Sequence, residues 1–317
     1  MTDLRTPAET AIGQCLDLRA HESLVVVTDD ERLPIGAALY EAGREVTTDA
    51  TLLRFPPRTQ HAEEPPAPVA AAMREADVFL APTTKSLSHT DARSAACAAG
   101  ARGATLPGIT EEVFTTGLDA DYDAIAAECA RMLDKVEGAE EIRVTSPQGT
   151  DVTFAFGDRE WHDDTGIVHE PGDFSNLPAG EVFISPVDAN GVFVVDGTIS
   201  PHSLLEAGQT VRFEVEDGTV TDIDDPDVAA EFEAAAEEVG ADAYNLAELG
   251  IGTNLAVTEL VGSVLLDEKA AGTVHIAVGD DASIGGDVSA PIHSDGVLRE
   301  PTVYVDGEVI DLPEPQR

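Results

Sequence analysis

The sequence has few basic residues. It contains 18 Lys and Arg against 61 Asp and Glu in 317 residues, a formal net charge of −43. Only three residues are lysines, Lys85, Lys135 and Lys269. A surface of this sign repels nucleic acids and anionic lipid head groups, so neither is expected as a partner. Because molar salt shortens the Debye length to about 3 Å and screens such repulsion, the composition predicts a halophilic protein.

Cysteines and long apolar runs are also scarce. The three cysteines, Cys15, Cys97 and Cys129, lie in Ala-rich stretches without CxxC spacing, which favours small core residues in a reduced compartment over disulfides. No apolar run approaches the ~18 residues of a membrane span, and the first ten residues contain no signal-peptide core. A cytoplasmic location is therefore expected.

Several common functional motifs are missing. The chain has no GxGxxG after its first predicted strand and no GxxxxGK[ST], GxSxG or HExxH. Nucleotide-binding, serine-hydrolase and zincin interpretations therefore lack their usual anchors.

The first part of the chain alternates strand-like and helix-like segments. This pattern predicts a mostly parallel α/β domain over residues 1–140. The expected strands are Ser23–Thr28, Thr51–Phe55, Asp77–Ala81 and Ala104–Leu106, and the expected helices are Arg32–Gly43, Pro66–Glu75, Ser88–Ala99 and Tyr122–Val136.

For the remaining part, residues 141–317, the pattern predicts a mixed, largely antiparallel β-rich α+β domain. Alternating apolar segments flank Asp217-Gly218 and Asp306-Gly307, and Asp-Gly between such segments is a strong hairpin signal. One helix is expected over Asp227–Val239, with Asp225 as its N-cap and Pro226 at its first position.

Potential metal ligands occur in this second part. His275 lies in an alternating strand (TVHIAVG), and on its own it is more often a hydrogen-bonded core residue. His293 and Asp295, however, are two positions apart and so share one face of an extended segment. Two histidines and one carboxylate can bind a non-haem Fe(II), and added carboxylates let such a set hold two divalent ions.

Two glutamates stand in unusually apolar surroundings for so acidic a chain. Glu181 follows a tight turn in NLPAGEVFISP, and Glu248 lies within NLAELGIG. A single carboxylate among 61 acidic residues is normally a solvated surface group. Between apolar neighbours it usually needs a partner or a metal, so both are candidate ligands.

These residues resemble the M29 metallo-aminopeptidases (the aminopeptidase T or leucyl aminopeptidase-like family), in a haloarchaeal-type member. The resemblance rests on Asn176–Pro186, Glu248, His275, His293 and Asp295, in that order, and more loosely on Pro82–Arg93, Leu106–Thr110 and Ile142–Phe154. It implies a homodimeric enzyme that removes N-terminal residues from peptides. Glu181, Glu248, His275, His293 and Asp295 would hold two divalent ions (Zn, Co or Mn), and Glu181 or Glu248 would relay the catalytic proton.

Two other functions remain open. Ala282 occupies the position at which the peptidases have a catalytic tyrosine. The same fold family includes Fe(II) ring-opening enzymes similar to 2,5-dihydroxypyridine dioxygenases, in which His275, His293 and Asp295 would be the iron ligands and Glu181 an acid/base. A non-catalytic small-molecule-binding protein is the third alternative.

Lys269 and Arg299 are expected to pair with neighbours such as Asp267 or Glu300.

Overall fold

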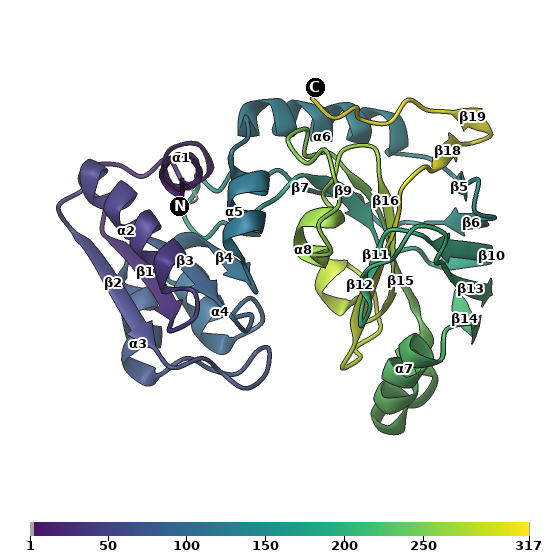
Figure 1. Ribbon diagram of the computed structural model, residues 1–317, viewed down its shortest axis with the longest axis horizontal. Helices are drawn as coiled ribbons and strands as arrows, with labels where there is room; N and C mark the ends of the chain where they lie inside the picture. Colours follow the sequence, from purple (N-terminus) through teal and green to yellow (C-terminus); the bar gives the residue numbers. More distant parts are fainter. Residues whose placement is uncertain (1–2, 317) are drawn as a thin grey trace. The chain divides into compact units, whose positions relative to one another are not determined.

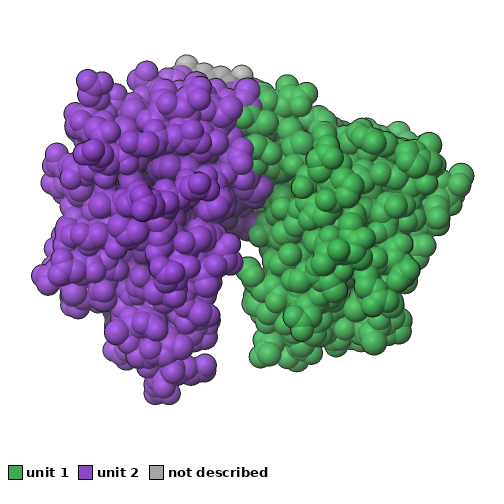
Figure 2. Space-filling view, turned by 180° about the vertical axis from the view of Figure 1, so that it is seen from behind, with its two compact units in different colours: residues 1–126, 165–179 green, residues 127–164, 180–317 purple. Residues whose placement is uncertain are grey.

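The computed structural model describes residues 3–316 and divides into two compact units. Unit 1 comprises residues 1–126 and 165–179, and unit 2 comprises residues 127–164 and 180–317 (Figure 2). Helix α6 (Tyr122–Val136) begins in unit 1 and continues into unit 2. The predicted fold class, an α/β part followed by a largely antiparallel β-rich part, is confirmed.

Unit 1 is built on a parallel sheet of five strands in the order β2-β1-β3-β4-β8. Figure 1 labels strands β1 to β4 of this sheet. The strands are β1 (Leu24–Asp29), β2 (Ala50–Phe55), β3 (Val78–Thr83), β4 (Arg102–Pro107) and β8 (Phe174–Asn176). The helical elements are α1 (Arg5–Thr10), the π-helix η1 (Ala11–Cys15), α2 (Leu33–Val46), α3 (Ala67–Glu75), α4 (Asp91–Ala98) and α5 (Glu111–Leu118).

The central strands of this sheet are buried along their whole length. Every residue of β1 and of β3 is buried, which explains why both appear in the sequence as continuous apolar runs. Thr90 and Thr110 cap α4 and α5 by accepting hydrogen bonds from backbone N–H groups three residues on.

Unit 2 contains two larger antiparallel sheets. The first has the order β14-β13-β10-β6-β5-β18-β19 and the second β17-β16-β15-β9-β7. The first comprises β5 (Glu141–Thr145), β6 (Asp151–Ala155), β10 (Asp188–Val195), β13 (Val211–Glu216), β14 (Thr219–Ile223), β18 (Thr302–Val305) and β19 (Glu308–Val309). The second comprises β7 (His162–Asp164), β9 (Glu181–Ile184), β15 (Leu246–Gly252), β16 (Val274–Gly279) and β17 (His293–Leu298).

Shorter elements complete unit 2. They are β11 (Thr198–Ile199), β12 (Ser203–Leu204), α7 (Pro226–Val239), α8 (Val264–Asp267) and the 3₁₀ turns η2 (Gly240–Tyr244) and η3 (Ala282–Ile284). The predicted cap of α7 is confirmed, because Asp225 accepts hydrogen bonds from the N–H groups of Asp227 and Val228.

The Asp-Gly hairpins also form as predicted. Asp217 and Gly218 have φ values of 49° and 72°, and Asp306 and Gly307 have φ values of 48° and 85°. Two consecutive left-handed residues give the turn whose twist matches that of the flanking strands.

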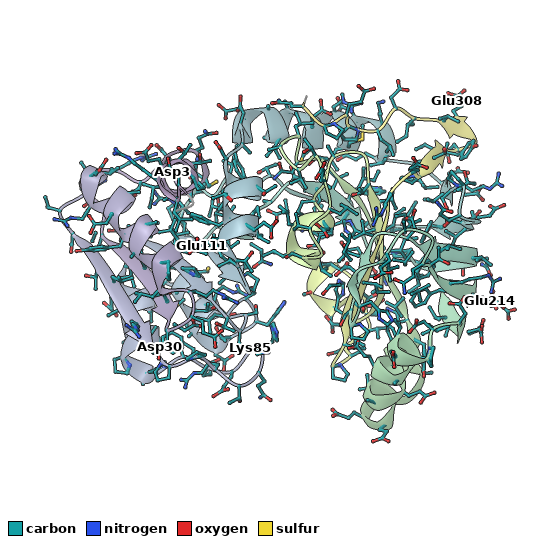
Figure 3. The ribbon with its side chains drawn as sticks, viewed as in Figure 1. Asp3, Asp30, Lys85, Glu111, Glu214 and Glu308 are labelled. Carbon is teal, nitrogen blue, oxygen red and sulfur yellow. The ribbon has the colours of Figure 1, made fainter. Side chains whose placement is uncertain are left out.

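Many of the acidic residues lie on the surface of both units. Figure 3 labels Asp30 and Glu111 in unit 1 and Glu308 in unit 2, and all three side chains are exposed. Within residues 3–316, no helix is long and apolar enough to cross a membrane, and the three cysteines form no disulfide.

Candidate metal centre

Strand register places the candidate ligands on one face of the second sheet of unit 2. In the pairing of β15 with β16, Glu248 stands opposite Ala277, and Ala277 stands opposite Asp295 of β17. Residues directly opposite each other across an antiparallel pair project from the same face. His275 and His293 lie two residues before Ala277 and Asp295, so both share that face.

Glu181 joins the same face from the other side of β15. Glu181 is the first residue of β9 and pairs with Gly252 of β15. Phe183 of β9 and His275 of β16 both stand opposite Gly250 of β15. All five side chains predicted as ligands therefore come together within unit 2, from four adjacent strands.

Glu248 is the centre of this cluster. Its Oε1 lies 3.2 Å from His275 Nε2, and its Oε2 lies 3.4 Å from His293 Nε2. His275 Nε2 is also 3.2 Å from Glu181 Oε2, and His293 Nε2 is 3.6 Å from Asp295 Oδ1.

The side chains thus form two triads with a common member. Glu181, Glu248 and His275 form one, and Glu248, His293 and Asp295 form the other, each with ligand atoms within 4.8 Å of one another. This grouping differs from the expected iron set, since Glu248 rather than His275 accompanies His293 and Asp295.

One end of the cluster faces solvent. Glu181 and Glu248 are each 6% exposed and His275 is 1% exposed, whereas the His293 side chain is 34% exposed. A small molecule would therefore approach the cluster from the His293 side.

A backbone carbonyl sets the orientation of His293. Its Nδ1 lies 2.7 Å from the carbonyl oxygen of Asp280. Because a carbonyl only accepts, Nδ1 must donate, and Nε2 is directed at Glu248 and Asp295. Metal-binding histidines are commonly fixed in this way, with the second nitrogen free for the ion.

The donor set fits a divalent cation. Glu181 Oε2 is buried and accepts no hydrogen bond among the described residues, although it lies 3.2 Å from His275 Nε2. Carboxylate oxygens and imidazole nitrogens are ligands of Fe, Mn, Co and Zn. A cation among these groups would neutralise the clustered carboxylates.

Charge compensation governs the pKa values of the cluster. Burial alone would raise the pKa of Glu248, but hydrogen bonds from His275 and His293 hold it well below its usual range. Burial alone would lower the pKa of both histidines, but the carboxylates around them raise the pKa of each well above its usual value. A bound metal would displace the histidine protons, so its affinity must fall in acid.

Lys269 is a site residue that the sequence analysis did not place in the cluster. Its ammonium group donates to Glu181 Oε1 and lies 2.8 Å from Glu268 Oε1, and the residue is only 4% exposed. The expected pairing with a sequence neighbour forms, but the neighbour is Glu268 and not Asp267, whose carboxylate accepts from the N–H groups of Val261 and Gly262 at 2.9 and 2.8 Å. The chain has only three lysines, and Lys269 is followed by two alanines. A rare lysine beside apolar residues was the signal in the sequence that could have identified it as a site residue.

Arg299 also departs from the expected ion pair. Its guanidinium donates to the carbonyl oxygen of Leu205 at 3.2 Å, and its backbone N–H donates to Asp196. Neither contact involves any of the five candidate ligands.

Gly250 is a second residue that sequence reasoning missed. A Cβ at this position would lie 2.0 Å from His275 Nε2, far inside van der Waals contact. The His275 ring therefore occupies the space that a side chain on β15 would fill. A glycine inside a strand pattern is the signal for such a close approach.

A separate cavity of about 490 Å³ lies in unit 2, beside Arg159 and His162. Its lining includes none of the five clustered ligands. Arg159 is already engaged there, because it donates to Gly285 O at 3.0 Å and to Asp287 at 3.1 Å. The candidate metal centre is therefore the clustered face of the sheet and not this cavity.

The fold and the cluster of candidate ligands indicate a metal-binding protein. Comparison with known proteins identifies its family. The family model for 2,5-dihydroxypyridine 5,6-dioxygenase (NicX) matches residues 12–311, so the chain belongs to this family. No curated protein matches the chain by sequence.

Two solved structures share the fold. A 2,5-dihydroxypyridine dioxygenase from Pseudomonas putida KT2440 superposes with a TM-score of 0.79 at 20% identity, covering 98% of this chain and 96% of that one. Wild-type AmpT from Thermus thermophilus superposes with a TM-score of 0.65 at 18% identity, covering 97% and 99%. At these identities the structures establish the fold alone.

These findings refine the resemblance seen in the sequence. The fold shared with the M29 aminopeptidases is confirmed, while the family match is to the dioxygenases, the second alternative above. Both families are enzymes that use metal ions. The expectation of a hydrolase is not confirmed.

Proposed function

We propose that this protein is an Fe(II)-dependent ring-opening dioxygenase that acts on a dihydroxylated aromatic compound. The observation that carries the proposal is the triad of Glu248, His293 and Asp295 at the solvent-facing end of the buried cluster. Membership of the 2,5-dihydroxypyridine 5,6-dioxygenase family supports the substrate class.

The triad suits this chemistry because it is small. One imidazole and two carboxylates would hold one ion and leave coordination positions free, whereas the facial triad of non-haem iron oxygenases has two histidines and one carboxylate. When bound, Fe(II) supplies the positions at which the substrate's ring oxygen and O₂ meet. His275, 3.2 Å from Glu248, stands within reach as a further ligand.

The protein's own residues supply orientation and proton transfer. The Asp280 carbonyl fixes the ring of His293, and Lys269 holds Glu181 through Oε1. Glu181 Oε2, which lies 3.2 Å from His275 Nε2 and accepts no hydrogen bond among residues 3–316, would accept a ring hydroxyl proton. That proton returns to the opened product, so the overall reaction adds O₂ to the substrate and consumes no other reagent.

Oxygen uptake tests this proposal directly. The protein, purified in molar KCl and loaded anaerobically with Fe(II), is expected to consume one O₂ per 2,5-dihydroxypyridine. His293→Ala should abolish uptake, while His202→Ala, which removes a histidine paired with Asp225 outside the cluster, should leave it unchanged. No uptake with any dihydroxylated aromatic would overturn the proposal.

An aminopeptidase-type hydrolase is the second candidate. It is favoured by the position of Glu248, whose two oxygens face different histidines, as a carboxylate bridging two ions would. Against it, Ala282 lies exposed in η3 and offers no hydroxyl at the position of the peptidase tyrosine. Release of leucine from a leucyl amide with Co(II), Zn(II) or Mn(II), without O₂ uptake, would establish this alternative.

A further inference from the structure

A buried lysine lies beside the first triad of candidate ligands, Glu181, Glu248 and His275. Lys269 contacts Glu181, a member of the first triad, and its side chain is 5% exposed. Its other partner, Glu268, has a side chain that is 13% exposed. The ammonium group is thus enclosed between two carboxylates, one of which belongs to the candidate metal centre.

The backbone around Lys269 is held in place at several points. Asp267 anchors the preceding turn by accepting hydrogen bonds from Val261 and Gly262 and from the hydroxyl of Thr198. The carbonyl oxygen of Lys269 accepts a 2.8 Å hydrogen bond from the N–H of Asn254, just beyond β15. These contacts direct the lysine side chain toward the sheet.

The absence of a side chain on Gly252 permits this approach. A Cβ at Gly252 would lie 2.1 Å from the carbonyl oxygen of Ala270, the residue after Lys269. The segment can therefore lie directly against β15, and Lys269 can reach Glu181 across the pairing of β15 with β9.

Lys269 makes the two triads unequal. In the first triad, Glu181 Oε1 already accepts a hydrogen bond from the Lys269 ammonium group. A divalent ion bound to Glu181 would therefore be repelled by a positive charge on the same carboxylate. In the second, Asp295 and His293 have no contact with Lys269 among the described ion pairs. A single divalent ion is therefore best accommodated by Glu248, His293 and Asp295.

We propose that the Lys269 ammonium group acts as a built-in cation that replaces a second metal ion and restricts the centre to one divalent ion. The inference rests on the proposed function for the identity of that ion, but not for the number of ions. Lys269 is thus a positioning residue that sets the metal content through Glu181.

Metal stoichiometry tests this inference. Wild-type protein and Lys269→Met are dialysed to equilibrium against Mn(II) in molar KCl, and the metal per chain is measured by mass spectrometry. We expect one ion in the wild type, two in Lys269→Met and one in Lys269→Arg, which restores the charge. Glu181→Gln in the Lys269→Met background should return the count to one.

The outcomes separate this inference from the proposed function. The inference is overturned if the wild-type protein binds any number of ions other than one per chain, or if Lys269→Met binds only one. If Lys269→Met does not fold, Lys269→Gln, which keeps a hydrogen-bond donor without the charge, is measured by the same criterion. A change from one ion to two without O₂ uptake by the iron-loaded wild type would leave the inference standing and reject the dioxygenase.

Discussion

Replacing Gly250 by alanine would place a methyl group against the His275 ring. The added Cβ would lie 2.0 Å from Nε2 and 2.2 Å from Cε1. Ordinary contact is about 3.5 Å, so the ring must move by about 1.5 Å. His275 is 1% exposed and lies 3.2 Å from Glu248 Oε1, so the displacement also disturbs Glu248.

The expected effect is a loss of metal affinity. Metal–ligand distances tolerate changes of only about 0.2 Å, well below the displacement of the ring. Disturbing groups that support a metal typically weakens binding by about 10–100-fold, and a loss at least this large is expected for Mn(II) or Fe(II). Overpacking should also lower the free energy of unfolding of the metal-free protein by about 1–3 kcal/mol.

Calorimetric titration with Mn(II) in molar KCl measures the affinity, and thermal unfolding shows whether the variant is folded. Gly13→Ala is the matched control, since a Cβ there meets no atom within 4 Å. Wild-type affinity in a folded Gly250→Ala variant would refute the argument that the His275 ring must lie over residue 250 for the centre to bind metal.

Three further predictions concern stability and reactivity. With a formal charge of −43, the melting temperature should rise between about 0.1 M and 1 M KCl, and an unchanged value would contradict the halophilic interpretation. The buried Arg102 donates hydrogen bonds to Glu22 and so lowers the pKa of the Glu22 carboxyl from 4.5. The pair therefore stabilises the fold fully above pH 4.5, and this stabilisation is lost as the pH falls through the lowered pKa. Arg102→Met should therefore cost about 3 kcal/mol in urea unfolding at neutral pH and less in acid, and an equal loss at both pH values would reject the assignment. Burial raises the pKa of Cys129 to about 12, and Cys15 is buried, so Cys97 should react first with a thiol reagent; equal rates for all three would contradict the core packing.

Much of the fold could be predicted because its signals are local. Apolar runs such as Leu24–Asp29 and the Asp-Gly turns act over a few residues, and both appear in the structure as expected. Strand β8 (Phe174–Asn176) was missed because it is three residues long and joins unit 1 only by pairing with β4, some 70 residues earlier in the chain. Nothing in so short a segment distinguishes a strand from a loop.

The candidate site was predictable in its members but not in its arrangement. Chemical type and the i, i+2 spacing of His293 and Asp295 drew attention to the right side chains. The grouping around Glu248 depends on the register of four strands, and the contact of Lys269 with Glu181 spans 88 residues. Neither follows from spacing, because register depends on pairings between distant segments.

The number and identity of metal ions in the wild-type protein test the central claim most directly. Protein purified anaerobically in high salt and supplied with Fe(II), Mn(II), Co(II) and Zn(II) is analysed by mass spectrometry, with His293→Ala in parallel. We expect one ion per wild-type chain, O₂ uptake with 2,5-dihydroxypyridine only when that ion is iron, and no ion bound in His293→Ala. Two ions per chain with hydrolysis of a leucyl amide would contradict it.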